Sequence, residues 1–325
     1  MKYTLCFFLT ALSILTNQFV SGQGKQPALV VGDAAPELVF EKWLKMGGFD
    51  HLEKGKVYVI DLWATWCTPC IAGMPHLSKL QEKYKDNGLE IIGITSEDKW
   101  GNTYEKVAEF VEKKDSIMQY NVAWVPKSMN KDSLTGIFVH PWMQKIGTMN
   151  LPTAIIIDRN GKIAFISDPH TIDQTLDEVI NNRHDLAKLK KNYLRGLEAL
   201  ALVEQFTGLL KDNNFSKAIR IGNIILDSFS YVKPVVYLAI ADAVPRIKGK
   251  INSNLLDIAL KAGKRGVLLT QFESPGFLSA LATVYAAREE YLLATIVEKA
   301  AVSVSEGQMK ENQIKEMEKF RSMIK

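Results

Sequence analysis

Two cysteines three residues apart, Cys67 and Cys70, stand between an apolar run and a segment with helical periodicity. The run, residues 57–63, is rich in β-branched residues and predicts a buried strand. From Cys70 to about Lys85, apolar residues recur at spacings of three and four, which predicts a helix. The two thiols can therefore close a small disulfide at a strand-to-helix turn.

Further strands and helices alternate up to about residue 186. Strands are predicted at residues 89–94, 153–158 and 162–166, and helices at 103–114 and 172–183. The dipeptide Asn160-Gly161 between the last two strands is a strong hairpin signal. Residues 120–150 lack clear periodicity, and we expect a short strand, a loop and a turn of helix there. This order predicts an α/β sheet with helices on its faces.

The length of 325 residues exceeds what a single core usually holds, so we expect about two domains. Beyond about residue 186 the strand signals disappear and the chain reads as helices. We predict an α/β domain of residues 23–186 and a helical domain of residues 187–325. Small residues such as Ala218 and Ala259 recur there at spacings similar to those of tetratricopeptide repeats. A plain helical bundle is the alternative.

The composition is that of a soluble globular protein, with 47% hydrophobic and 23% charged residues. A net charge of +4 is small for this length, and basic residues are mixed with acidic ones. We therefore expect no nucleic-acid binding. The histidines are dispersed, which favours surface or capping roles, and we expect no metal site. The segment from Asp168 to His170 is expected to be structural.

The N-terminal residues follow the pattern of a secretory signal peptide. Lys2 precedes the apolar run of residues 5–15, which is too short for a comfortable membrane span. Val20 and Gly22 fit a small-residue cleavage site. We expect residues 1–22 to be removed and the protein to be exported to the periplasm. The alternative is anchoring to the membrane by an uncleaved N-terminal segment.

Cleavage would remove Cys6 and leave Cys67 and Cys70 as the only cysteines of the mature chain. A zinc site would need further ligands, and a second Cys-x-x-Cys is absent from the sequence. A haem attachment would need histidine directly after the second cysteine, where Ile71 stands. The pair therefore favours redox chemistry over a structural disulfide, with the disulfide itself as the redox group and no added cofactor.

Cys67 would lie at the N-terminus of the predicted helix, where the macrodipole and free amide groups favour an anion. Such a site lowers the pKa of a thiol from its usual value of about 8.5, and the thiolate is the species that attacks a disulfide. Cys67 is therefore the predicted nucleophile and Cys70, one turn deeper, the predicted resolving cysteine. We expect Trp66 to flank the thiolate, partly exposed. Thr68 and Pro69 would tune the reduction potential.

Residues 61–70, DLWATWCTPC, resemble the strand, active-site turn and helix of the thioredoxin superfamily. Residues 32–36, GDAAP, resemble the opening of its exported TlpA/ResA-type members. The resemblance covers about residues 30–185. It implies a thioredoxin-like fold, with a central mixed sheet and flanking helices. It also implies a thiol–disulfide oxidoreductase, working as a reductase on disulfides of exported proteins and supplied by a membrane electron donor.

The segment from Leu151 to Thr153 looks like the cis-proline segment of this family. A cis Pro152 would let the backbone of Leu151 pair with an extended substrate chain beside Cys67. The alternative is an ordinary trans proline at the entry to a strand, since few X-Pro bonds are cis.

Asp61 lies in the predicted buried strand, where desolvation raises the pKa of a carboxyl group. By resemblance it would accept the proton of Cys70 during resolution; the alternative is a hydrogen-bonded structural acid. Many TlpA/ResA-type proteins carry Glu three residues after the second cysteine, where this chain has Gly73. This difference puts the role of that Glu in doubt here and shifts the function to Asp61.

Two other functions stay open. The opening of residues 32–36 is shared with peroxiredoxin-like peroxidases, although those enzymes place Thr-x-x-Cys where this chain has CTPC at residues 67–70. Alternatively, the helical domain is a binding module that recruits a protein client for the redox domain.

Overall fold

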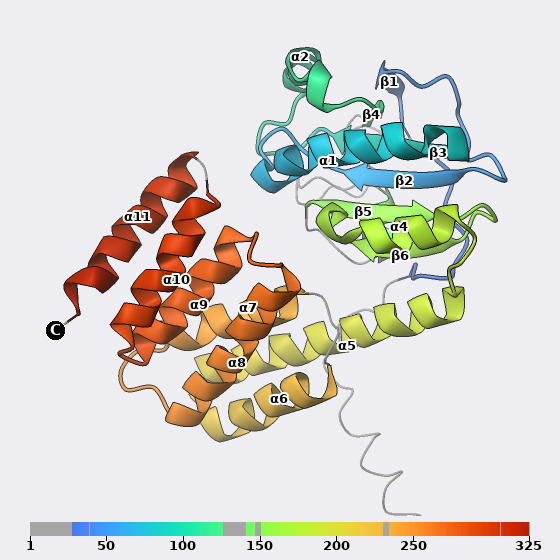
Figure 1. The fold of residues 1–325 in the computed structure, drawn as a ribbon. Helices are drawn as coiled ribbons and strands as arrows, with labels where there is room; N and C mark the ends of the chain where they lie inside the picture. Colours follow the sequence, from blue (N-terminus) through green and yellow to red (C-terminus); the bar gives the residue numbers. More distant parts are fainter. Residues whose placement is uncertain are drawn as a thin grey trace, which may run out of the picture. The chain divides into compact units, whose positions relative to one another are not determined.

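The computed structural model describes residues 28–38, 40–125, 141–146, 151–229, 234–305 and 307–324. The chain divides into two compact units between Leu194 and Arg195. We call residues 1–194 the sheet unit and residues 195–325 the helical unit (Figure 1). The predicted signal peptide, residues 1–22, lies outside the described residues. Among the helices that are described, none is both long enough and apolar enough to span a bilayer.

The sheet unit is built on six strands in the order β1-β4-β3-β2-β5-β6. Their bounds are β1 Lys42–Lys45, β2 Val57–Leu62, β3 Leu89–Ser96, β4 Asn121–Val125, β5 Thr153–Ile157 and β6 Ile163–Ser167. Strands β2, β3 and β4 are parallel, whereas β1, β5 and β6 each run antiparallel to the strand beside them. This mixed sheet, with the helices that flank it, confirms the predicted thioredoxin-like fold (Figure 1).

The helices of the sheet unit follow its strands in the predicted order. They are α1 Thr68–Tyr84, α2 Tyr104–Lys113, α3 Pro141–Ile146 and α4 Asp173–Ile180, with the short 3-10 turns η1 Lys85–Asn87, η2 Asp115–Ile117 and η4 Pro169–Thr171. Met74 of α1, Val107 of α2 and Leu176 of α4 share one hydrophobic core with β2. Every residue of β2 is buried, which explains its continuous apolar run.

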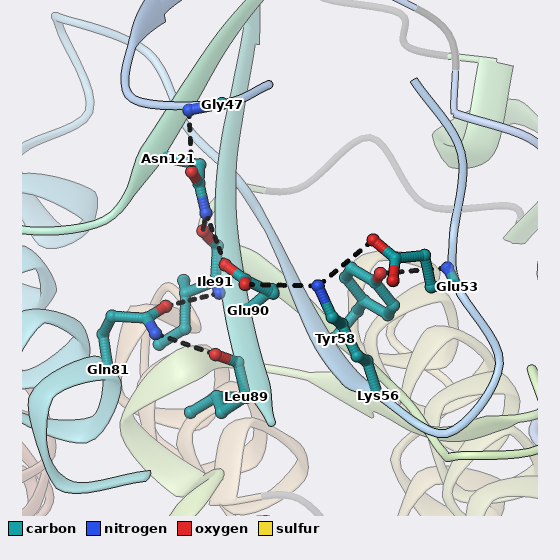
Figure 2. Close-up of polar contacts among 9 residues, drawn as sticks. All are labelled: Gly47, Glu53, Lys56, Tyr58, Gln81, Leu89, Glu90, Ile91 and Asn121. Carbon is teal, nitrogen blue, oxygen red and sulfur yellow. Dashed lines mark hydrogen bonds and ion pairs between the residues drawn. The ribbon is translucent and has the colours of Figure 1, made fainter. Parts of the chain in front are cut away.

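Polar side chains fix α1 and the neighbouring strands in register (Figure 2). Gln81 of α1 donates to the carbonyl of Leu89 at 2.8 Å and accepts from the amide of Ile91 at 2.6 Å. Asn121 of β4 donates to the Ile91 carbonyl at 3.0 Å and accepts from the Gly47 amide at 2.9 Å. The helix that begins with the cysteines is therefore held at its far end to β3.

The helical unit contains the later part of α5 and all of α6 to α11. The bounds are α5 Leu186–Lys211, α6 Phe215–Ser228, α7 Pro234–Ala243, α8 Ser253–Leu269, α9 Pro275–Ala287, α10 Tyr291–Ser303 and α11 Gly307–Ser322, with the 3-10 turn η5 Val244–Arg246 after α7. The predicted domain boundary at residue 186 falls at the start of α5, whereas the division between the units lies within this helix.

Successive helices from α7 to α11 pack against one another, and small residues lie where they meet. A side chain at Gly222 of α6 would come within 2.9 Å of Ile258 of α8, and one at Gly266 of α8 within 2.4 Å of Phe277 of α9. Ala218 and Ala259, which suggested a repeat, are both fully buried. The close approach of these helices therefore depends on glycine and alanine, while tetratricopeptide-like packing stays a prediction.

Candidate active site

Cys67 and Cys70 form a disulfide at the start of α1, directly after β2. Cys67 is the N-cap of the helix, and its Sγ accepts a hydrogen bond from the Cys70 amide at 3.3 Å. Pro69 lies in the first turn, where its fixed φ angle suits a helix start and its missing N–H costs nothing. Both cysteines are buried in this oxidised state, and Thr68 and Pro69 between them are exposed.

The turn before the disulfide is held by a buried asparagine. Asn102 accepts hydrogen bonds from both the amide and the hydroxyl of Thr65, at 2.9 and 2.8 Å. Its amide nitrogen donates to the Thr95 hydroxyl at 2.9 Å and to the Ser96 carbonyl at 2.6 Å. Asn102 therefore ties the turn to the end of β3. Sequence reasoning missed this residue, because nothing local distinguishes it from other loop asparagines.

An exposed aromatic pair lies beside the disulfide. Trp66 is 43% exposed, and its ring meets that of Trp100, which is 51% exposed, edge to face at 5.3 Å. Asp98 accepts from the Trp66 indole at 2.6 Å and from the backbone amides of Trp100 and Asn102 at 2.9 and 3.0 Å. One carboxylate thus binds the Trp66 ring and the Trp100 backbone. Trp66 was a predicted site residue, but Asp98 and Trp100 were not.

Asp61 lies on β2, six residues before Cys67, and is 1% exposed. Neither carboxylate oxygen has a hydrogen-bond partner among the described residues, and the same holds for the buried Tyr120 hydroxyl and Trp63 indole. The pKa of Asp61 is raised to about 7. Burial is the main cause, a charged His170 opposes the rise, and Asp168 adds to it. This carboxyl group is therefore poised to exchange a proton near neutral pH.

The segment that ends β6 returns to the cysteine-bearing helix. Pro169 and His170, in η4, lie over Gly73 of α1, where a side chain would come within 3.3 Å of the imidazole ring. Asp168 binds His170 and raises the pKa of its imidazole. Sequence reasoning gave this segment a structural role only. The signal that could have revealed its position is a glycine, Gly73, in the interior of the predicted helix.

The peptide bond between Leu151 and Pro152 is cis. Thr153, the next residue, pairs with Leu62 at the end of β2, just before the turn that carries the cysteines. The sheet register therefore brings the cis-proline segment next to the active-site turn.

The predicted site residues thus gather at one end of the central strands, where β2 ends and α1 begins. Within the described part of the chain, no group of three or more His, Cys, Asp or Glu side chains is placed to hold a metal ion. The arrangement offers a disulfide at the start of a helix, a buried acid and an exposed aromatic surface.

The sheet unit is similar in sequence to known proteins. A family model described as Redoxin matches residues 30–180 and so spans both cysteines. The chain is 30% identical to the thiol-disulfide oxidoreductase ResA of Bacillus cereus over 171 residues, 50% of this chain and 86% of ResA. It is 26% identical to Protein FixW of Rhizobium leguminosarum over 160 residues, 47% of this chain and 67% of FixW.

Solved structures are similar over the same region. One is the thioredoxin domain of a thiol-disulfide oxidoreductase from Bacteroides vulgatus, 26% identical, which covers 43% of this chain and 89% of its own with a TM-score of 0.35. The match to ResA spans most of that protein, and the Redoxin match contains the cysteine pair. The chain therefore belongs to the TlpA/ResA-type thiol–disulfide oxidoreductases of the thioredoxin superfamily.

Proposed function

We propose that this oxidoreductase works as a reductase, in which Cys67 attacks disulfides of exported proteins and Cys70 resolves the mixed disulfide. The observation that supports this assignment is the position of Cys67 at the N-cap of α1, bound by the Cys70 amide and bonded to Cys70. Amide groups and the helix dipole at this end favour the anionic sulfur that attack requires.

The reaction transfers two electrons from the dithiol to the substrate. The Cys67 thiolate attacks one sulfur of the substrate disulfide, so that a Cys67–substrate bond forms and the first substrate thiolate leaves. Cys70 then gives up its proton and attacks the Sγ of Cys67. The Cys67–Cys70 bond forms, the bond to the substrate breaks, and the second thiolate leaves. The chain is oxidised, and both substrate thiolates take protons from water.

In this proposal Asp61 accepts the proton of Cys70. Its buried carboxyl group has a pKa of about 7, so an appreciable fraction is ionised at neutral pH and can take a proton. Its two oxygens have no competing hydrogen-bond donors among the described residues. A purely structural acid in such a position would be expected to have partners that offset its burial.

Substrate recognition would combine backbone pairing with aromatic contact. The cis bond before Pro152 leaves the backbone of Leu151 to pair with an extended chain, a mode that tolerates varied sequences. The exposed rings of Trp66 and Trp100 would cover the apolar part of a protein substrate next to its disulfide. These features suit protein disulfides better than a small, buried ligand.

Export and the supply of electrons complete the proposal. Periplasmic location rests on the sequence pattern of residues 1–22, and N-terminal sequencing of the mature protein should begin at Gln23. Retention of Met1 would contradict cleavage. A membrane donor would re-reduce the Cys67–Cys70 disulfide, and the reaction needs no further cofactor because the dithiol form of the pair carries both electrons.

The test is the reduction of insulin disulfides by dithiothreitol, with the wild type, Cys67→Ser and Cys70→Ser. The wild type should accelerate the reaction and Cys67→Ser should lose the acceleration. Cys70→Ser, reduced beforehand and mixed with insulin without dithiothreitol, should accumulate a mixed disulfide. Circular dichroism of each variant serves as the folding control. Equal rates for the wild type and Cys67→Ser would overturn the proposal.

The direction of electron flow has its own measurement, the reduction potential of the Cys67–Cys70 couple. A value near that of thioredoxin, about −270 mV, supports a reductase, whereas a value near about −120 mV would make the protein an oxidant.

A further inference from the structure

The turn η4 places a histidine against the cysteine-bearing helix. Pro169 is buried on α1, and the ring of His170 lies so close to Gly73 that a β-carbon there would be 3.3 Å from its Cε1 and 3.4 Å from its Nε2. This side chain also reaches solvent, since 43% of its surface is exposed. His170 therefore connects the packed surface of α1 with water.

Asp168 fixes the orientation of this ring. Its Oδ1 lies 2.7 Å from His170 Nδ1 and also accepts the His170 backbone amide at 2.9 Å. A carboxylate can only accept, so Nδ1 must carry the hydrogen in this bond. The neutral imidazole therefore keeps Nε2, the nitrogen that faces α1, free to accept a proton.

Asp61 needs such a partner, because a carboxyl group that is 1% exposed cannot exchange protons with bulk water by itself. The two charged groups whose fields reach Asp61 are His170 and Asp168. We propose that His170, oriented by Asp168, carries protons between the buried carboxyl group of Asp61 and solvent during resolution by Cys70. This inference rests on the proposed function, and it makes His170 a proton-carrying residue that acts through Asp61.

The proton follows one path in this scheme. When the Sγ of Cys70 attacks the Sγ of Cys67 and the substrate thiolate leaves, the Cys70 proton passes to Asp61. Asp61 passes it, directly or through a bridging water, to Nε2 of His170, which releases it to solvent. The electron balance of the reaction is unchanged, since only the fate of this proton is specified.

The charges around the path are few. Asp168 raises the pKa of His170, and Asp61 adds a smaller effect in the same direction, while burial opposes both. Tyr120 lies near Asp61 but stays neutral, because burial raises its pKa well above the usual value. The elements α1 and α4 also carry a second histidine–aspartate pair, His76 and Asp173, with Nε2 and Oδ2 2.9 Å apart.

The test separates the two steps of the reaction in the reduced protein. A nitroaromatic disulfide releases one coloured thiolate when Cys67 attacks it and a second when Cys70 resolves the mixed disulfide. His170→Gln should slow the second release roughly a hundredfold near neutral pH, the lower end of what positioned acid–base groups contribute. The first release should keep its rate. Added imidazole should restore the rate of the second release.

Two further variants sharpen the comparison. His76→Gln removes the matched histidine on α1 and should leave both releases unchanged. Asp61→Asn should slow the second release, and the double variant with His170→Gln should be no slower than Asp61→Asn alone, because both residues lie on one path. The slowing of the second release in His170→Gln should also become smaller at alkaline pH, because hydroxide there takes the Cys70 proton directly.

A second release in His170→Gln with the rate and pH profile of the wild type would overturn the inference. So would a slowing of both releases that imidazole leaves unchanged, since that result indicates a displaced α1. Failure of the proposed function gives a different signature, in which Cys67→Ser still releases the first thiolate at the wild-type rate.

Discussion

Asp61 is a carboxylic acid in one of the two central strands of the sheet, and its side chain faces the same core as Val59 and Trp63. A protonated acid without partners costs the fold some free energy, and an ionised one costs more. Strongly raised pKa values cluster at functional sites because such positions are retained despite this cost. The buried environment of Asp61 therefore has a consequence for stability that can be measured apart from activity.

Replacing Asp61 with Asn should stabilise the oxidised protein, and more so at higher pH. The folded pKa of about 7 lies above the ordinary value of 3.8, so the wild type loses stability as pH rises from about 4 to about 7. Asn cannot ionise, so the variant does not lose this stability as pH rises. The advantage of Asp61→Asn in the free energy of unfolding should grow by roughly 3 kcal/mol between about pH 5 and about pH 8.

Denaturant unfolding of both oxidised proteins at the two pH values measures this difference. The same comparison in the Cys67→Ser background is a useful control, because it shows whether the disulfide contributes to the pH dependence of the stability difference. An advantage that is the same at both pH values would contradict the raised pKa.

Whether a site residue could be predicted from the sequence depends on how close in sequence the residues that identify it lie. Cys67 and Cys70 were predicted because the strand, the pair and the helix are contiguous in sequence. Asp61 was predicted as buried because it lies inside an apolar run. His170 was missed, since its closeness to Gly73 arises only when η4 folds back on α1. Asn102 was missed for the same reason, because its bonds to Thr65 span a loop and a strand.

At the scale of elements, continuous apolar runs predicted the central strands β2, β3 and β5 nearly to their ends. The edge strand β1, Lys42–Lys45, was not predicted. Its four residues are partly exposed and have no clear alternation, so only pairing with β4, remote in sequence, makes them a strand. The predicted contents of residues 120–150 are partly described, as β4 and α3, and the segments 126–140 and 147–150 lie outside the described residues.

Three helices of the helical unit are joined by one buried polar network. Ser279 of α9 donates to Glu298 of α10 at 2.8 Å and accepts from Gln313 of α11 at 2.9 Å. Gln313 also accepts from Ser305. The second carboxylate oxygen of Glu298 is buried without a partner among the described residues. Burial raises the pKa of Glu298 to about 7, and the Ser279 bond lowers it.

Replacing Glu298 with Gln should therefore stabilise the helical unit at alkaline pH. Gln keeps an oxygen to accept the Ser279 bond and carries no charge to bury. The wild-type carboxyl group loses stability as pH rises from about 4.5 to about 7, because its folded pKa is the higher one. The gain of Glu298→Gln should grow by roughly 2 kcal/mol between about pH 5 and about pH 8.

Thermal unfolding followed by the helical signal at both pH values checks this expectation. Ser279→Ala should weaken the network at every pH, so it separates loss of the hydrogen bond from loss of the charge. A pH-independent gain for Glu298→Gln would mean that the carboxyl group ionises in the folded protein at its ordinary pKa of 4.5, and would contradict the raised pKa.

At the scale of the whole molecule, the described residues form separate cores in the two units. The core of the sheet unit includes Met74 and Leu176 and reaches Leu189 in the first turns of α5. The cores of the helical unit begin at Ala199 of the same helix and continue to Phe320 of α11. One helix thus contributes to both, and the cooperativity of the protein depends on whether α5 transmits unfolding from one core to the other.

Separate cores predict two unfolding transitions in calorimetry of the full chain. At about pH 8, Asp61→Asn should raise the midpoint of one transition and Glu298→Gln the midpoint of the other, because each carboxyl group lies in a different unit. The double variant should show both shifts unchanged, since distant sites add. Each shift should be several degrees for units of this size. A single transition that both variants move would instead show that the continuous helix α5 couples the two cores into one cooperative fold.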